Sequence, residues 1–229
     1  MSMTSHILLI NPNSSQATSD MMHAIARKTA AGRVAVAIAT ANRNPPMIVN
    51  GPQLEAAADQ VIEIGSSHGQ DCRGIIVSAF GDPGLAALRE RVDVPVVGIC
   101  EASMIEAARD GRRFGVATTT PDLVEAIAGR ARDLGLDHLY AGIRCTAGDP
   151  IALAGDEKLL GQSLAEAVRE CIELDGAEAV IIGGGPLGQA AEQLQPMFDT
   201  PIIAPIPCAM ERVLGLLPTG CGVLSPVPA

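Results

Sequence analysis

The chain has 229 residues, of which 48% are hydrophobic, so it can bury a large core in one domain or two. A formal net charge of −10 and the lack of tryptophan argue against a nucleic-acid partner, which needs a basic face or stacking aromatic rings. No apolar run approaches the roughly 20 residues that a membrane span requires. Residues 1–6 lack the basic and apolar regions of a signal peptide, so we expect a cytoplasmic protein without a membrane partner.

Short apolar runs predict the strands. Those in the first half lie at residues 7–10, 34–38, 74–78 and 95–99. Their counterparts in the second half lie in the same order at residues 114–117, 139–143, 179–183 and 201–205. Each counterpart follows its partner by 105 to 107 residues, and so constant an offset indicates a duplicated unit.

Between these runs the apolar period changes to that of a helix. The predicted helices span about residues 52–65, 121–135, 156–174 and 209–217. Apolar strands that alternate with helices are typical of parallel sheets covered on both faces. We therefore expect an α/β fold of two pseudo-symmetric lobes, each a roughly four-stranded parallel sheet flanked by helices, with the active-site cleft between them. The expected first lobe comprises residues 1–100 plus 208–229, and the second comprises residues 101–207.

Helix-capping patterns follow the first and third strands of each half. Asn13 and Gln16 are spaced like a capping box, Thr120 and Asp82 each precede a proline, and Gly184 precedes the turn into residues 185–186. Helix N-termini at the carboxyl ends of parallel strands are where open α/β sheets bind ligands. Such caps are common in α/β proteins, but their recurrence in both halves favours a cleft that binds a small anion through free N–H groups.

The cysteines and histidines indicate no dedicated metal site. The six cysteines form no C-x-x-C pair, and no two of the four histidines lie at ligand spacing. Cys171 lies in line with Leu160, Leu164 and Val168 at helical spacing, which is typical of a core position. We expect neither a metal nor another cofactor.

Four segments carry a resemblance to a known family. They are residues 10–15 (INPNSS), 80–85 (FGDPGL), 98–102 (GICEA) and 176–179 (GAEA), the last before a glycine-rich strand end. Together they resemble the aspartate/glutamate/hydantoin racemase superfamily, and its hydantoin and allantoin racemase branch most of all. The resemblance implies a two-lobed enzyme that needs no cofactor. In this family a cysteine thiolate from one lobe removes the proton alpha to a carbonyl, and a cysteine thiol from the other lobe returns one to the opposite face.

Both of those cysteines are replaced in this chain. The family pattern places them at Ala79 and Gly184, and neither residue has an atom that titrates. Because one positioned acid or base contributes about 10² to 10⁴ in rate, two-cysteine racemisation is not expected. The related arylmalonate decarboxylases keep the second cysteine, so Gly184 departs from that branch as well. A natural branch with other chemistry, an engineered variant and a binding protein descended from an enzyme are the three explanations, and the altered turn around Gly184 favours the first.

Three other residues are candidates for acid–base chemistry. Cys100 and Glu101 follow the fourth strand, and Cys208 follows the counterpart of that strand. Each also has a plain alternative, the thiols as small buried residues and Glu101 as a first-turn helix carboxylate. Asp82 is expected to cap its own helix, and Ser78 is expected to point away from the cleft because it alternates with Ala79.

The predicted function is that of a superfamily enzyme, most simply an isomerase, acting on a small anionic or ureide-type molecule such as a hydantoin-like ring or a substituted dicarboxylate. There are two alternatives. One is a lyase or hydrolase that stabilises an oxyanion with the same free N–H groups, and the other is a non-catalytic binding protein. We also expect a homo-oligomer. Uncharged groups at the turns are expected to hold the substrate. They belong to Asn11, Ser14, Ser15, Ala79, Phe80, Gly81, Thr118, Thr119, Gly184, Gly185 and Pro186.

Overall fold

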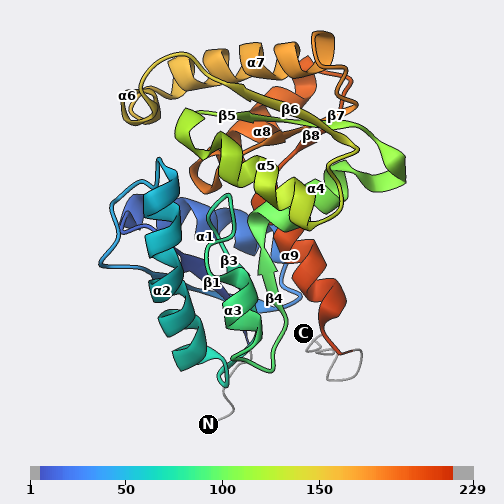
Figure 1. The fold of residues 1–229 in the computed structure, drawn as a ribbon. Helices are drawn as coiled ribbons and strands as arrows, with labels where there is room; N and C mark the ends of the chain where they lie inside the picture. The colour runs from blue at the N-terminus through green and yellow to red at the C-terminus, as the bar shows by residue number, and fades with distance from the viewer. Residues whose placement is uncertain (1–5, 219–229) are drawn as a thin grey trace, which may run out of the picture.

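The computed structural model describes residues 6–218, which form two stacked parallel sheets (Figure 1). The first sheet has the order β2-β1-β3-β4 and the second the order β6-β5-β7-β8, so the two repeat the same topology. The strands of the first sheet are β1 (His6–Asn11), β2 (Ala35–Thr40), β3 (Cys72–Val77) and β4 (Val96–Gly98). Those of the second are β5 (Phe114–Thr118), β6 (Tyr140–Cys145), β7 (Ala179–Ile182) and β8 (Ile202–Ile203). The predicted fold, two four-stranded parallel sheets flanked by helices, is confirmed.

Helices connect successive strands, as parallel pairing requires. In the first half they are α1 (Gln16–Ala30), α2 (Gly51–His68), α3 (Leu85–Arg89) and α4 (Ile99–Ala107). In the second half they are α5 (Val124–Asp133), α6 (Pro150–Ala154), α7 (Glu157–Glu173), α8 (Gly188–Leu194) and α9 (Pro205–Leu216). Short 3₁₀ turns are η1 (Arg109–Gly111), η2 (Pro121–Leu123), η3 (Gly185–Leu187) and η4 (Gln195–Met197). No helix among these is long and apolar enough to span a membrane.

Three apolar cores lie between the helices and the sheets. Leu8 and Ile10 of β1 point outward to α2 and α3, whereas Ile7 and Leu9 point inward, because successive strand residues face opposite sides. The inner core contains residues of both sheets, including Phe114 of β5, together with α1, α4, α5 and α9. The outer core of the second sheet lies against α7 and α8. The two lobes thus share their central core.

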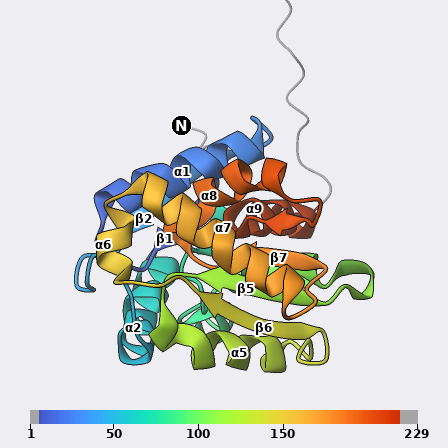
Figure 2. The same ribbon diagram turned by 90° about the horizontal axis from the view of Figure 1, so that it is seen from above.

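Helices from both halves of the chain cover two sides of the molecule (Figure 2). Figure 2 shows α1, α8 and α9 on one side of the molecule and α2 and α5 on the other. Helix α9 packs against α1 and α4 and against the strands β3 and β4 of the first sheet. It begins at Pro205, four residues before the predicted start at residue 209, because proline suits the first turn of a helix, where its missing N–H is not needed.

Candidate active site

The turns that follow β3 and β7 meet at the boundary between the lobes. A methyl group added to Gly185 would lie 3.0 Å from the carbonyl oxygen of Ser78, and one added to Gly183 would lie 3.1 Å from the ring of Phe80. Approach this close requires glycine on the second-lobe side. Residues 78–81 and 183–185, far apart in sequence, therefore lie next to each other, and these turns include Ala79 and Gly184, where the resemblance predicts the family's cysteines.

The turns present free donors at this place. Ala79 and Gly184 are partly exposed, whereas Ser78 is buried, as the alternation along β3 predicted. Within residues 6–218 the backbone N–H groups of Ala79, Phe80 and Gly184 have no protein acceptor. Donors of this kind can hold a carbonyl, carboxylate or enolate oxygen without an arginine or lysine.

The turn after β1 differs from its prediction. The Asn11 side chain donates to Asn13 Oδ1 at 3.0 Å and to Ser19 Oγ at 2.9 Å, and its own Oδ1 accepts from the Asn13 N–H at 3.1 Å. Asn11 is thus occupied in holding the loop and is not a free donor. Ser15, and not Asn13, is the cap of α1, since its hydroxyl accepts from the Thr18 N–H at 3.2 Å. The N–H of Ser14 donates to Pro45 O, while the partly exposed Ser14 hydroxyl makes no hydrogen bond to residues 6–218.

Threonines occupy the corresponding end of the second sheet. Thr118 donates from Oγ1 to the carbonyl oxygen of Gly183 at 2.6 Å and so fixes the turn that carries Gly184. Thr119 and Thr120 are buried beside it. Sequence reasoning missed Thr146, which follows β6 and is 7% exposed, with no hydrogen-bond partner for its Oγ1 among the described residues. The duplication would have pointed to it, since residues after matched strands share one edge.

Asp82 does not cap its own helix, as the sequence had suggested, but the N-terminus of α4. Its carboxylate accepts from the N–H groups of Cys100 at 2.9 Å and Glu101 at 2.8 Å. The cap of α3 is Gly84 instead. Asp82 has a φ of 53°, a left-handed conformation that costs energy in a residue with a side chain. Its two charge-assisted hydrogen bonds to α4 offset that cost and lock the 79–82 turn onto the helix.

Buried charges surround this carboxylate. Glu101 pairs with Arg89, and Arg130 of α5 lies 3.5 Å from Asp82 Oδ2 and 3.7 Å from Glu101 Oε2. The side chains of Asp82 and Glu101 are 0% and 4% exposed, so solvent screens these interactions weakly. Neither arginine was a sequence candidate, because their meeting depends on helices that are distant along the chain.

The three predicted acid–base residues stay predictions, and their surroundings weigh against direct contact with a substrate. Cys100 is 0% exposed, and burial raises the pKa of its thiol well above the ordinary value, with Asp82 adding to the rise. Burial likewise raises the pKa of Cys208, on α9, to about 12. Such thiols stay protonated at neutral pH. Glu101 is 3% exposed and is held between two arginines.

The pKa of Asp82 gives a stability prediction. Desolvation raises it from 3.8 to about 7, although the N–H groups of Cys100 and Glu101 and the charge of Arg130 oppose the rise. Between these two pH values the folded protein holds a proton that the unfolded chain has lost, so Asp82 makes the free energy of unfolding fall as pH rises from about 4 to about 7. We expect a contribution on the order of 2–4 kcal/mol. Urea unfolding at pH 5 and pH 8 measures it. Asp82→Asn, which cannot ionise, should remove that part of the slope, and parallel pH profiles for the two proteins would contradict the assignment.

Two surface hollows lie away from the lobe boundary. One, of about 870 Å³, is lined by α7 and α8 and includes Lys158 and Arg169; the other, of about 530 Å³, lies beside α2 and Arg91. Among residues 6–218 no group of three or more His, Cys, Asp or Glu residues could hold a metal ion. The meeting turns are therefore the place where the described residues combine close approach across the lobes with free donors.

Comparison with known proteins identifies the family of this chain. Residues 7–213 match the sequence profile of the family described as Asp/Glu/Hydantoin racemase. The chain belongs to this racemase family. It is 30% identical to the hydantoin racemase of Rhizobium meliloti over 94% of this chain and 90% of that protein, and 27% identical to the hydantoin racemase of Paenarthrobacter aurescens over 93% and 92%.

Solved structures agree with the family assignment. The allantoin racemase of Klebsiella pneumoniae is 29% identical and superposes with a TM-score of 0.85, over 93% of this chain and 87% of that one. Allantoin racemase of Pseudomonas fluorescens has the same fold, with a TM-score of 0.87 at 22% identity over 96% of this chain and 100% of that one. This racemase-family chain is thus an enzyme of the isomerase type by its relationships, with alanine and glycine at the two turns that meet.

Proposed function

We propose that this protein is a cofactor-independent enzyme that acts at the carbon alpha to a carbonyl in a hydantoin-like ureide or a small carboxylate. The proposal rests on one observation above others, the meeting of the 78–81 and 183–185 turns, in which the N–H groups of Ala79, Phe80 and Gly184 have no acceptor among residues 6–218. The hydantoin and allantoin racemases among the relatives favour a ureide ring as the substrate.

In the proposed site the substrate oxygen next to the reacting carbon accepts from the N–H groups of Ala79, Phe80 and Gly184. Such donors stabilise the enolate that forms when the alpha proton leaves, because they are already oriented toward the charge. The Thr118 hydroxyl, bonded to Gly183, keeps one set of donors in place. The partly exposed hydroxyl of Ser14 is a further donor at the same edge.

Proton transfer is the step in which this chain departs from the two-cysteine pattern. Positions 79 and 184 have no titrating atom, so another group must supply the acid and the base. Two candidates, Cys100 and Glu101, lie against the 79–82 turn, since their N–H groups donate to Asp82. Cys208 is the third. Cys100 and Glu101 are buried, so each would act only when that turn moves, whereas Cys208 is partly buried on α9. We therefore expect a slower proton transfer than at an exposed thiolate.

Deuterium exchange tests the proposal. Purified protein is incubated in D₂O with enantiopure allantoin, enantiopure 5-methylhydantoin or a monosubstituted malonate, and proton NMR follows the alpha position. We expect enzyme-dependent deuterium incorporation with a ureide, at a rate about 10² or more below that of a two-cysteine hydantoin racemase assayed beside it. Fast loss of optical rotation would contradict the assigned roles of positions 79 and 184.

The same spectra separate the alternatives. Signals of new products, without deuterium exchange into the remaining substrate, would indicate a lyase or hydrolase. Saturable binding in calorimetry without exchange or products would indicate a binding protein. Either result would overturn the proposed isomerase chemistry while leaving the family membership intact.

A further inference from the structure

An ionic cluster with two buried carboxylates joins the lobes next to the proposed site. Its members are Asp82 from the turn after β3, Glu101 from α4, Arg89 from α3 and Arg130 from α5. Asp82 and Arg89 come from the first lobe as the sequence delimits it, and Glu101 and Arg130 come from the second. Two carboxylates and two guanidinium groups make the cluster neutral, provided that all four are present.

Asp82 transmits the state of this cluster to the site. It lies three positions after Ala79, and its N–H donates to the carbonyl oxygen of Ala79 at 3.0 Å. Its carboxylate fits against α4 only because position 98 is glycine, since a methyl group there would lie 2.2 Å from Asp82 Cγ. The strained φ of 53° at Asp82 shows that these contacts, and not the preference of the residue, set the shape of the turn.

Arg130 completes the arrangement from the other side. Its guanidinium lies between the two carboxylates, and its side chain is 22% exposed. Its remaining partner is Asp133, one turn along α5, at 3.2 Å. Without Arg130, Asp82 and Glu101 would be two buried carboxylates facing a single arginine, an arrangement that strongly favours protonation of one of them.

We propose that Arg130 is a positioning residue that couples the second lobe to the 79–82 turn through Asp82, and so holds the donors of Ala79 and Phe80 in register with the 183–185 turn. It touches neither the turn donors nor the proposed substrate position. The expected effect on substrate binding rests on the proposed function, since a substrate held by both turns needs the turns at a fixed separation. The contacts of Arg130 with Asp82 and Glu101, which we call the Arg130 latch, are a property of the free protein.

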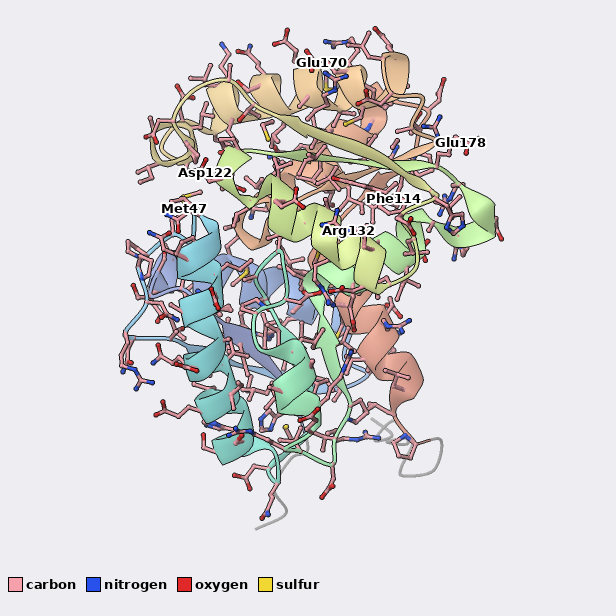
Figure 3. The ribbon with its side chains drawn as sticks, in the orientation of Figure 1. Met47, Phe114, Asp122, Arg132, Glu170 and Glu178 are labelled. Atoms are coloured by element: carbon pink, nitrogen blue, oxygen red, sulfur yellow. The ribbon has the colours of Figure 1, made fainter. Side chains whose placement is uncertain are left out.

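Arg130→Gln tests the coupling, with Arg132→Gln as the matched control on the same helix. Arg132 lies on α5 in Figure 3 and pairs with Glu125 at 2.8 Å, both largely exposed. Hydrogen exchange followed by mass spectrometry should show faster exchange in the 78–90 peptide of the first lobe for Arg130→Gln, by about tenfold or more, and no change for Arg132→Gln. Carbon-13 NMR of the Asp82 carboxyl should show its titration midpoint raised by about one pH unit or more in Arg130→Gln only.

The conservative variant provides the rescue. Arg130→Lys retains the charge, so it should restore the Asp82 midpoint and most of the protection of the 78–90 peptide. If Arg130→Gln does not fold, the same comparison is made between Arg130→Lys, which keeps the charge, and Arg130→Met, which removes it. Both variants are then measured in a stabilising osmolyte. Unchanged exchange and an unchanged Asp82 titration in the charge-removing variant would overturn the proposal.

Substrate measurements then separate this proposal from the proposed function. With allantoin as the ligand, Arg130→Gln should raise KM or Kd about tenfold or more, while Arg132→Gln behaves as the parent. If the parent protein neither binds nor exchanges any ureide, the proposed function fails, yet the two measurements on the free protein still decide the latch. If the parent binds and Arg130→Gln binds equally well despite a looser turn, the coupling to the site is refuted.

Discussion

Introducing both cysteines, Ala79→Cys together with Gly184→Cys, should increase deuterium exchange at the alpha carbon of a 5-substituted hydantoin by about 10² or more over the parent. The two turns already meet across the lobes, so the thiols would arrive on opposing elements of one site. Gly184 has an extended backbone, with φ 160° and ψ 137°, which cysteine adopts without strain. Its added Cβ would lie 3.1 Å from the flexible end of Leu187, a contact that a small shift of that side chain relieves.

The controls isolate the thiol chemistry from the change in shape. The double variant Ala79→Ser with Gly184→Ser has almost the same volume but hydroxyl groups that do not ionise near neutral pH, so it should stay at the parent rate. Each single cysteine should gain much less than the pair, since one face of the substrate would still lack its acid or base. A folded double-cysteine variant that exchanges no faster than the double serine would show that the turns do not flank the reacting carbon.

The fold was predictable because its signals are local. Runs such as residues 7–10 and 74–78 are apolar on both faces, which few structures other than a covered parallel strand allow. The constant spacing of the runs in the two halves predicted a duplicated unit, and the two sheets have the same strand order. Even the error at the start of α9 is local, because Pro205 can end a strand or begin a helix.

For the candidate site, the sequence predicted a location at the ends of the strands, and that location stays a prediction. Helix starts were predicted after the strands, but Ser15 and not Asn13 caps α1, and Gly84 and not Asp82 caps α3, because tertiary packing sets the partner of each polar side chain. Asn11 donates a hydrogen bond to Ser19, eight positions later. Asp82 accepts hydrogen bonds from the N–H groups of Cys100 and Glu101, which follow it by 18 and 19 positions. Arg130 is farther still along the chain from Asp82. No periodicity relates such residues, so their roles follow from the structure alone.

Gly98 shows how one small residue specifies this packing, and Gly98→Ala should lower the free energy of unfolding by about 3–5 kcal/mol. The backbone at Gly98, with φ −91° and ψ 148°, suits alanine, so the cost comes from the side chain alone. The new Cβ would lie 2.2 Å from Asp82 Cγ and 2.3 Å from its Oδ1. The carboxylate must therefore leave, which deprives two buried N–H groups of α4 and the Arg130 guanidinium of their partner.

A double-mutant cycle distinguishes this collision from a general intolerance of position 98. Asp82→Gly removes the obstructing side chain and suits the φ of 53°, so Gly98→Ala should cost less than about 1 kcal/mol in that background. Gly161→Ala, where an added Cβ meets nothing within 4 Å, is the control and should leave stability unchanged or slightly raised. Urea denaturation at pH 8 gives all four free energies of the cycle. If Gly98→Ala costs the same with and without Asp82, the carboxylate does not occupy the space against α4, and both the capping role of Asp82 and the Arg130 latch that depends on it would fail.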